Sequence, residues 1–333
     1  MKVDGAIGGF QDAADMAVVQ ESYGLDGLWS AETGHDPFMP LLLAALATER
    51  VELGTGIAVA LARNPMITAA QANDIQLASR GRFILGLGSQ IKPHVEKRFS
   101  MPWSHPAARM REFVLALRAI WDCWNNDTLL DFRGDFYTHT LMTPFFSPGP
   151  NPYGPPKVFL AAVGTRMAEV AGEVGDGMLV HPFTTERYLK EVTLPAVERG
   201  LARAGRRRDG YELSSTVFVV TGDGAQREAA ASMVRGQIAF YGSTPAYRGV
   251  LDLHGWGELQ SELNALSKQG RWSDMAALVT DDILDTFAIV ADLDQVPERI
   301  MERFGVVQRV GFYLPVSDDP EVRAQLIGQL RSA

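Results

Sequence analysis

Four side chains that can accept or donate a proton lie directly after short apolar segments of the chain or in the loops that follow them. They are Glu32, His35, His94 and His181. Histidine changes its charge near neutral pH, and carboxylates serve widely as general acids and bases, so these four are the candidates for moving a proton. Glu32 has a second interpretation, in which it pairs with Arg63 or caps the next helix, and a lone loop histidine such as His35 is commonly only solvated.

Two pairs of glycines interrupt β-rich segments, within residues 54–56 and 86–88. Glycine inside a strand indicates a bulge, or a close approach by a ligand or another backbone. A flat ring system pressed against the backbone would need such a clearing, and a tight barrel corner would need it equally, so both interpretations stay open. Ser89 and Gln90 follow the second pair and carry hydrogen-bonding groups that suit the polar edge of a heterocycle.

A candidate anion site lies where an apolar segment runs into a helical pattern. Gly164, Thr165 and Arg166 stand at this junction. Backbone N–H groups at a helix N-terminus, a hydroxyl and a guanidinium together can hold a phosphate. The alternative is an ordinary helix cap by Thr165, with Arg166 on the surface.

Other chemistries have little support in the sequence. The six histidines never occur in His-x-His or His-x-x-x-His spacing, and there is one cysteine, so we expect no metal site. No Gly-x-Ser-x-Gly nucleophile elbow is present. The formal net charge of -9 repels phosphate backbones, so we expect no nucleic-acid partner.

Apolar, β-rich segments alternate with amphipathic helical patterns along the chain. The predicted strands are residues 3–7, 27–30, 51–57, 83–87, 158–161, 177–180, 212–220 and 309–314. The predicted helices are residues 12–23, 38–48, 65–79, 105–124, 165–173, 186–204 and 226–241. Such alternation builds a parallel sheet, and eight units close into a (β/α)8 TIM barrel with its active site at the carboxyl ends of the strands. The alternative, a doubly wound open sheet, lacks its Gly-x-Gly-x-x-Gly turn after the first strand.

Two stretches depart from this alternation, at about residues 125–157 and 242–292. We expect them to be insertions into a single domain of residues 1–333, the second of them covering the pocket. Tyr241, Tyr247 and Trp256, in or beside the second stretch, favour a hydrophobic small-molecule substrate.

The chain carries no recognisable targeting or membrane signal. Its first residues lack the charged and apolar regions of a signal peptide, and no apolar run reaches the roughly 18 residues of a membrane span. We therefore expect a cytoplasmic protein with no membrane partner.

Taken in order, these motifs resemble the luciferase-like monooxygenase superfamily, especially its branch of coenzyme F420-dependent oxidoreductases. The resemblance covers nearly the whole chain and rests on residues 24–32, 54–57, 64–65, 79–88 and 168–177. It implies a ring bound at the carboxyl face, against a bulge with a non-prolyl cis peptide at Gly56–Ile57. It also implies that Ser89 faces the cofactor, that the turn at Gly164 and Thr165 holds its phosphate, and that Glu32 or Thr33 lies near the ring.

The sequence departs from the best-known members of that superfamily in two places. Thr33 stands where many relatives have a histidine, and Ile91 stands where the sugar-phosphate dehydrogenases carry an acidic residue. A sugar-phosphate dehydrogenase is therefore disfavoured.

We expect an enzyme that transfers a hydride between coenzyme F420 and a hydrophobic small molecule. The alternative with the same fold is an FMN-dependent monooxygenase. A third hypothesis is a non-redox barrel that binds a small molecule, or a hydrolase that uses Glu32 and Asp36. The resemblance also makes a homodimer a reasonable expectation.

Overall fold

A closed barrel of parallel strands forms the centre of the computed structural model, which describes residues 1–313, 316–317 and 319–332. The barrel strands are β1 (Lys2–Ile7), β2 (Gly27–Ser30), β3 (Glu52–Thr55), β5 (Phe83–Gly88), β8 (Lys157–Ala162), β9 (Gly177–Val180), β10 (Glu212–Val220) and β12 (Arg309–Phe312). Each strand pairs in parallel with the next, β10 pairs with both β9 and β12, and β12 closes the ring on β1. The predicted (β/α)8 barrel is confirmed, while the predicted end of the last strand, Leu314, lies outside the described residues.

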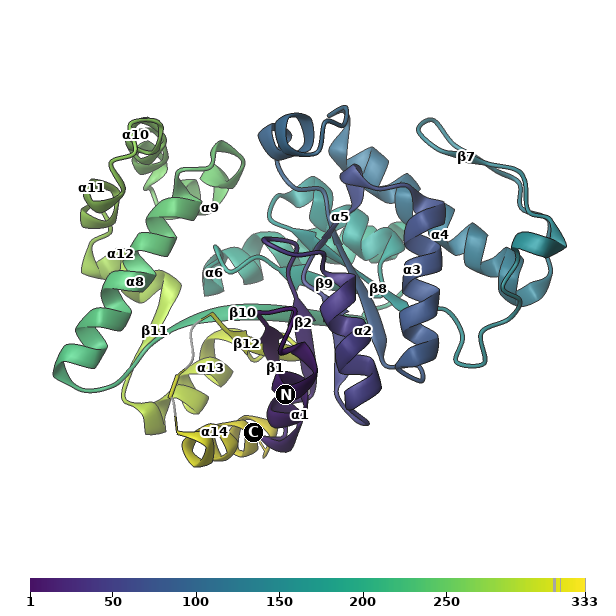
Figure 1. Cartoon of the computed structure of the whole chain (residues 1–333). Helices are drawn as coiled ribbons and strands as arrows, with labels where there is room; N and C mark the ends of the chain where they lie inside the picture. Colours follow the sequence, from purple (N-terminus) through teal and green to yellow (C-terminus); the bar gives the residue numbers. More distant parts are fainter. Residues whose placement is uncertain (314–315, 318, 333) are drawn as a thin grey trace.

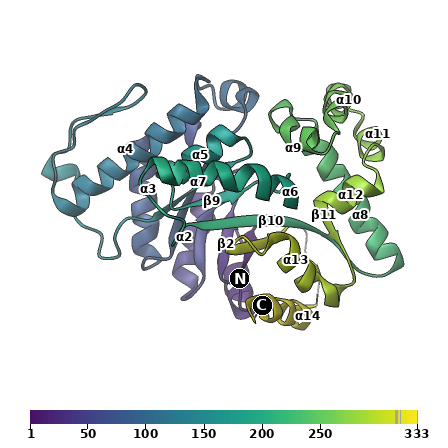
Figure 2. The ribbon, with the colours of Figure 1, turned by 180° about the vertical axis from the view of Figure 1, so that it is seen from behind.

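Helices surround the barrel (Figures 1 and 2). They are α1 (Ala13–Ser22), α2 (Phe38–Ala47), α3 (Pro65–Ala78), α4 (Pro106–Asn126), α5 (Thr165–Val174), α6 (Glu186–Tyr188), α7 (Leu194–Arg203), α13 (Val296–Phe304) and α14 (Pro320–Ser332). Shorter helical turns are η1 (Ala60–Ala62), η2 (His94–Arg98), η4 (Leu189–Thr193) and η6 (Leu293–Gln295). The apolar sides of the long helices join one continuous core with the outer faces of the strands.

The helix predicted at residues 226–241 exists, but it does not cover the barrel. It is α8 (Gly224–Gly242), whose buried side chains, such as Val234 and Ile238, belong to a second and separate apolar cluster. The helix that packs on the barrel core before β12 is α13, through Ile300 and Phe304. The sequence pattern identified the helix correctly and misplaced it, because periodicity shows an apolar face but not its partner.

The second insertion is a helical lobe beside the barrel, which begins at α8 and so extends further towards the N-terminus than residue 242 (Figure 1). We call α8 to α12 the lobe. Its other elements are η5 (Pro245–Tyr247), α9 (Arg248–Leu253), α10 (Gly257–Lys268), α11 (Trp272–Ala277) and α12 (Asp281–Phe287). The chain returns through β11 (Ala288–Val290), which pairs with the end of β10. A single domain over residues 1–333 stays a prediction.

The first insertion forms an arm that extends from the end of α4, away from the lobe (Figure 1). It contains the antiparallel strands β6 (Phe132–Arg133) and β7 (Thr138–His139), followed by η3 (Pro144–Phe146). The carboxylate of Glu112 on α4 accepts three backbone N–H groups of residues 135–137, which fixes the base of the arm.

The third predicted strand is interrupted. It ends at Thr55, the Gly56–Ile57 peptide is cis, and β4 (Ala58–Val59) then pairs with the end of β5. The expected strand at residues 51–57 was therefore too long, whereas the cis bond implied by the resemblance is present.

Candidate active site

A buried cluster of charges closes the amino-terminal end of the barrel interior. Arg309 is fully buried and donates from Nε and Nη2 to the two carboxylate oxygens of Asp4, both at 2.8 Å. Its Nη1 contacts Glu52 and also Glu212, the latter at 3.1 Å. The indole N–H of Trp29 donates to Asp4 at 2.9 Å, and the guanidinium lies over the Trp29 ring at 5.6 Å. Charge at this end serves stability, since barrel enzymes place their chemistry at the other end.

The strand glycines are explained by packing inside the barrel. A Cβ on Gly54 would overlap the ring of Trp29. A Cβ on Gly86 would overlap the carbonyl oxygen of Thr55. The Thr55 hydroxyl donates a hydrogen bond to the Gly86 carbonyl and accepts one from the Gly86 N–H. At these two positions the structure favours the tight-barrel interpretation over a clearing for a ring.

The interior becomes open above this packed layer. Side chains alternate along a strand, so the inward positions continue two residues further towards each carboxyl end. Several inward residues at this level are small, among them Ala6, Ala161, Thr216 and Gly311, while Gly56 lies against Trp29 and a Cβ on Gly88 would overlap the Ile57 side chain. Ala6 is exposed although it shares the inward side with Asp4, so solvent reaches the interior here. We call this carboxyl end of the barrel the mouth.

Glu32 sits at the edge of the mouth with its carboxylate already engaged. Its Oε2 accepts the N–H of Val59 at 2.7 Å and pairs with Arg63. The guanidinium of Arg63 also reaches Asp36, at 3.2 Å. The alternative in which Glu32 pairs with Arg63 is the one that the structure shows. The two carboxylates of the hydrolase hypothesis thus share one arginine.

The other candidates from the first strands lie on the rim. His35 and His94 are exposed, and the backbone carbonyl of Thr33, also exposed, accepts a hydrogen bond from Arg98 at 2.7 Å. Ser89 and Gln90 are half-buried at the end of β5. Both make local bonds, from Ser89 Oγ to the Gln90 carbonyl and from the Ile91 N–H to Gln90 Oε1. Their roles towards a cofactor stay predictions.

The N-terminus of α5 is open to solvent at the same end of the barrel. Gly164, Thr165 and Arg166 are all exposed, and no side chain caps the helix. The cap by Thr165, the alternative weighed for this turn, is therefore not formed. No described residue lies within 4 Å of a Cβ added at Gly164, so there is open space beside this turn. The preceding Val163 carbonyl accepts the hydroxyl of Tyr188, which ties this turn to α6.

His181 follows β9 and stands against aromatic side chains of the lobe. Its ring lies 4.6 Å from Tyr241 on α8 and 4.7 Å from Tyr247 in η5, measured between centroids. The N–H of Phe183 donates to His181 Nδ1 at 3.0 Å. Tyr313 completes this aromatic group through Tyr241, at 6.4 Å. Tyr247 thus brings the second insertion into contact with His181, and that this insertion covers the pocket stays a prediction.

The histidine of this group is neutral at physiological pH. Burial lowers the pKa of His181 to about 4. Burial also raises the pKa of Tyr241 and of Tyr247. The sequence analysis identified His181, Tyr241 and Tyr247 but missed Tyr313. Tyr313 could have been found because it lies one residue beyond a barrel strand, on the inward side.

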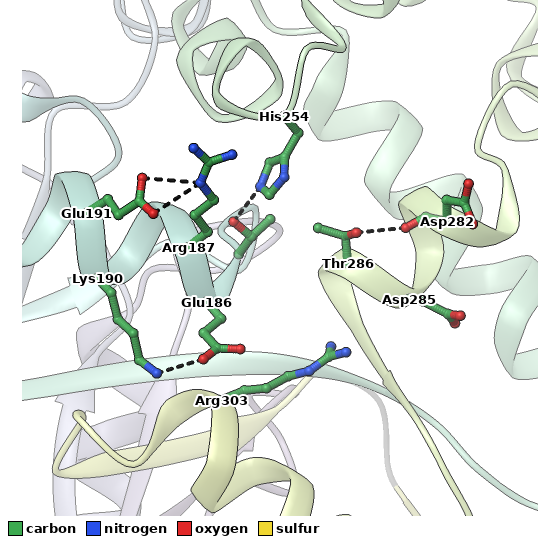
Figure 3. Close-up of a pocket in the computed structure, with 10 residues that line it drawn as sticks. Glu186, Arg187, Lys190, Glu191, His254, Asp282, Asp285, Thr286 and Arg303 are labelled. Atoms are coloured by element: carbon green, nitrogen blue, oxygen red, sulfur yellow. Dashed lines mark hydrogen bonds and ion pairs between the residues drawn. The ribbon is translucent and has the colours of Figure 1, made fainter.

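A charged groove of about 620 Å³ lies between α6 and the lobe, and the sequence did not indicate it (Figure 3). Its lining residues are Thr185, Glu186, Arg187, Lys190, Glu191, His254, Asp282, Asp285, Thr286 and Arg303. Lys190 and Arg187 pair with carboxylates of the same helical segment, and His254 Nε2 lies 2.8 Å from Thr185 Oγ1. The groove mixes both signs of charge, unlike a phosphate site.

Within the described residues, no group of three or more His, Cys, Asp or Glu side chains is placed to hold a metal ion. In the same part of the chain, none of the helices combines the length and apolar character that crossing a bilayer requires.

Comparison with known proteins identifies the family. The model of the luciferase-like monooxygenase family matches residues 2–308. An uncharacterised protein of Mycobacterium tuberculosis is 58% identical, over 93% of this chain and 92% of that protein. The 5,10-methylenetetrahydromethanopterin reductase of Archaeoglobus fulgidus is 30% identical, over 93% of this chain and 91% of the reductase. The chain belongs to the luciferase-like monooxygenase family, as the sequence predicts, and so to a family of oxidoreductases.

Solved structures agree on the fold. The coenzyme F420-dependent tetrahydromethanopterin reductase of Methanopyrus kandleri has a TM-score of 0.79 at 22% identity, covering 98% of this chain and 97% of that one. The oxygenating constituent of 3,6-diketocamphane monooxygenase of Pseudomonas putida, in complex with FMN, has a TM-score of 0.64 at 16% identity, covering 96% and 91%.

Proposed function

We propose that this chain is a coenzyme F420-dependent oxidoreductase that transfers a hydride between the deazaflavin and an uncharged, hydrophobic small molecule. The observation that carries the proposal is the composition of the mouth, where the carboxylate of Glu32 is paired and His181 is neutral. Such a site can bind and orient a molecule but holds neither a protonated histidine at His181 nor an unpaired carboxylate at Glu32, so we infer that its chemistry comes from a bound cofactor. The 28% identity to a putative coenzyme F420-dependent oxidoreductase of Mycobacterium tuberculosis supports coenzyme F420 as that cofactor.

The residues of the mouth fit a flat ring with a phosphate tail. The small inward residues Ala6, Ala161 and Gly311 would border the ring, beside the bulge at Gly56 and Ile57, whose Ile57 side chain fills the space next to Gly88. The open N-terminus of α5 offers N–H groups and Arg166 to a phosphate. When bound, the deazaflavin supplies the hydride chemistry, and the chain supplies orientation and a path for the proton.

Cofactor titration tests this proposal. Purified protein is titrated separately with coenzyme F420 and with FMN, and binding is followed by fluorescence. We expect F420 to bind and FMN not to bind; binding of FMN alone would refute the proposal. Arg166→Ala should weaken F420 binding about tenfold, the loss expected for one charge-assisted phosphate contact. Arg207→Ala is the matched control. Arg207 is also an exposed arginine, with a side chain 88% exposed, it is remote from the α5 turn in sequence, and its ion-pair partner within the described residues is Asp209.

An FMN-dependent monooxygenase is the second candidate. It is supported by the FMN-bound monooxygenase of the same fold. Oxygen uptake that requires reduced FMN, together with formation of an oxygenated product, would establish it in place of the first proposal.

The proton donor, the cellular location and the assembly stay predictions within this proposal. Glu32, His35, His94 and His181 remain the candidates for the donor, and a cytoplasmic homodimer is still expected. Light scattering on the purified protein tests the dimer.

A further inference from the structure

The side chain of His181 points into the mouth. Two inward residues precede it on the same side of β9. A Cβ at Gly177 would meet the Phe159 ring at 2.5 Å, and Leu179 Cδ1 lies 2.9 Å from the corresponding position of Gly86, across the barrel interior. Because side chains alternate along a strand, residue 181 continues this inward row at the level of the mouth.

The hydrogen bonds of the ring define which nitrogen carries the proton. Nδ1 accepts the N–H of Phe183 at 3.0 Å, so in the neutral imidazole the proton is on Nε2. Within the described residues Nε2 has no hydrogen-bond partner, and the half-buried ring leaves this atom partly open to solvent. It is therefore a donor that solvent, or a ligand in place of solvent, can reach.

The surroundings keep the ring neutral. The groups that face it from the lobe are the side chains of Tyr241 and Tyr247, which burial holds in their protonated form. Burial is the cause of the low pKa of His181, with no contribution from a charged side chain. A charged ligand group would find no countercharge at this wall of the mouth, so an ion bound there would lose its hydration without compensation.

We propose that His181 is a substrate-binding residue whose Nε2–H donates a hydrogen bond to an uncharged carbonyl or hydroxyl oxygen, with Tyr241 and Tyr247 of the lobe packing around the apolar part of the same molecule. This deepens the proposed function and rests on it, since it names the substrate class as neutral, oxygen-bearing and otherwise apolar. It also removes His181 from the four candidate proton donors, because a neutral imidazole with one fixed N–H positions an oxygen without protonating it.

The first test reads the histidine directly and needs no cofactor. In ¹⁵N-labelled full-length protein, the imidazole nitrogen shifts report both the tautomer and the titration of each histidine, and the signals lost in His181→Gln assign the residue. We expect the Nε2–H tautomer with no titration between pH 8 and pH 5.5. A proton on Nδ1, or a midpoint near 6.5, overturns the proposal.

The second test measures binding, with cyclohexanone as the neutral probe. We expect saturable binding to the wild type, a three- to tenfold higher Kd for His181→Leu, and a smaller change for His181→Gln, whose amide keeps a donor near the position of Nε2. Binding that is absent in the wild type, or unchanged in His181→Leu, overturns the proposal. The cyclohexanone experiment and the F420 titration test different proposals. Failure of the protein to bind F420 refutes the proposed function. Normal F420 binding, together with unaltered cyclohexanone binding in His181→Leu, refutes this inference alone.

Discussion

Replacing Arg309 by methionine should destabilise the fold severely. Arg309 is fully buried between three carboxylates, and the Asp4 side chain that receives two of its hydrogen bonds is 2% exposed. Methionine has a similar volume but leaves Asp4 buried with only the Trp29 N–H as a partner. Removing one member of a buried ion pair costs about 3–5 kcal/mol.

The loss of stability expected for Arg309→Met lies in the lower part of the range of about 3–5 kcal/mol. Glu52 and Glu212 keep their other cations, because Lys2 contacts both and Lys157 contacts Glu212 at 2.7 Å. The stranded charge is therefore mainly that of Asp4, and we expect a loss of about 3 kcal/mol in the free energy of unfolding. A domain with a total stability of about 5–15 kcal/mol should survive this loss at room temperature.

Urea unfolding followed by circular dichroism measures the loss. Arg207→Ala, at a side chain 88% exposed, is the control and should change stability by less than about 0.5 kcal/mol. Adding Asp4→Asn to Arg309→Met removes the stranded charge and should recover at least about 1 kcal/mol. A loss below about 1 kcal/mol for Arg309→Met, or no recovery in the double variant, would refute the reasoning.

The same cluster predicts a dependence on acid. Burial alone would raise the pKa of Glu212, but the ion pairs with Lys157 and Arg309 hold it at about 2. A carboxylate with a lowered pKa contributes stability above the unfolded value of 4.5, and this contribution is lost as the pH falls towards 2. The free energy of unfolding of the wild type should fall as the pH drops from 4.5 to 2. It should fall more steeply than that of Arg309→Met, which lacks one of the cations that lower the pKa of Glu212.

Three further predictions concern single residues. The pKa of His181 is about 4 in the folded protein and about 6.5 in the unfolded chain, so the free energy of unfolding should fall by up to about 3 kcal/mol as the pH drops from 6.5 to 4. His181→Gln should lack this pH-dependent loss. Urea midpoints of His181→Gln that follow those of the wild type across this pH range would contradict the prediction. Gly54→Ala should lower the free energy of unfolding by about 1–3 kcal/mol because the new methyl overlaps Trp29, whereas Gly236→Ala, in an open helical position, should raise it by about 0.5 kcal/mol; equal effects would contradict the packing argument. Glu32→Ala should lower the melting temperature through a loss of about 1–3 kcal/mol, since it leaves the buried Val59 N–H without its acceptor, while Arg63 keeps Asp36 and the Val59 carbonyl; an unchanged melting temperature would show that this carboxylate does not support the bulge.

Much of the fold could be predicted from local patterns in the sequence. The eight barrel strands were predictable because apolar alternation and its interruption by helical periods depend only on neighbours along the chain. The cis bond at Gly56–Ile57 was implied by the resemblance to the family, and the candidate phosphate turn at Gly164 was suggested by its position before a helix.

The tertiary contacts of individual residues could not be predicted from local patterns. Whether Gly54 made room for a ligand or for Trp29, and whether Glu32 was free or paired with Arg63, depended on contacts between segments 25 to 31 residues apart. The sequence left both choices open, since glycine and carboxylate have the same local signature in either case.

The sequence by itself thus determined the barrel and its family, and it named candidate residues in the loops that follow the barrel strands. Only the tertiary structure decided that α8 belongs to the lobe and α13 to the barrel, and that Tyr241 and Tyr247 enclose His181. The physical reason is that periodicity encodes which face of an element is buried, whereas burial, tautomer and pKa at a site are set by whichever distant side chains pack against it.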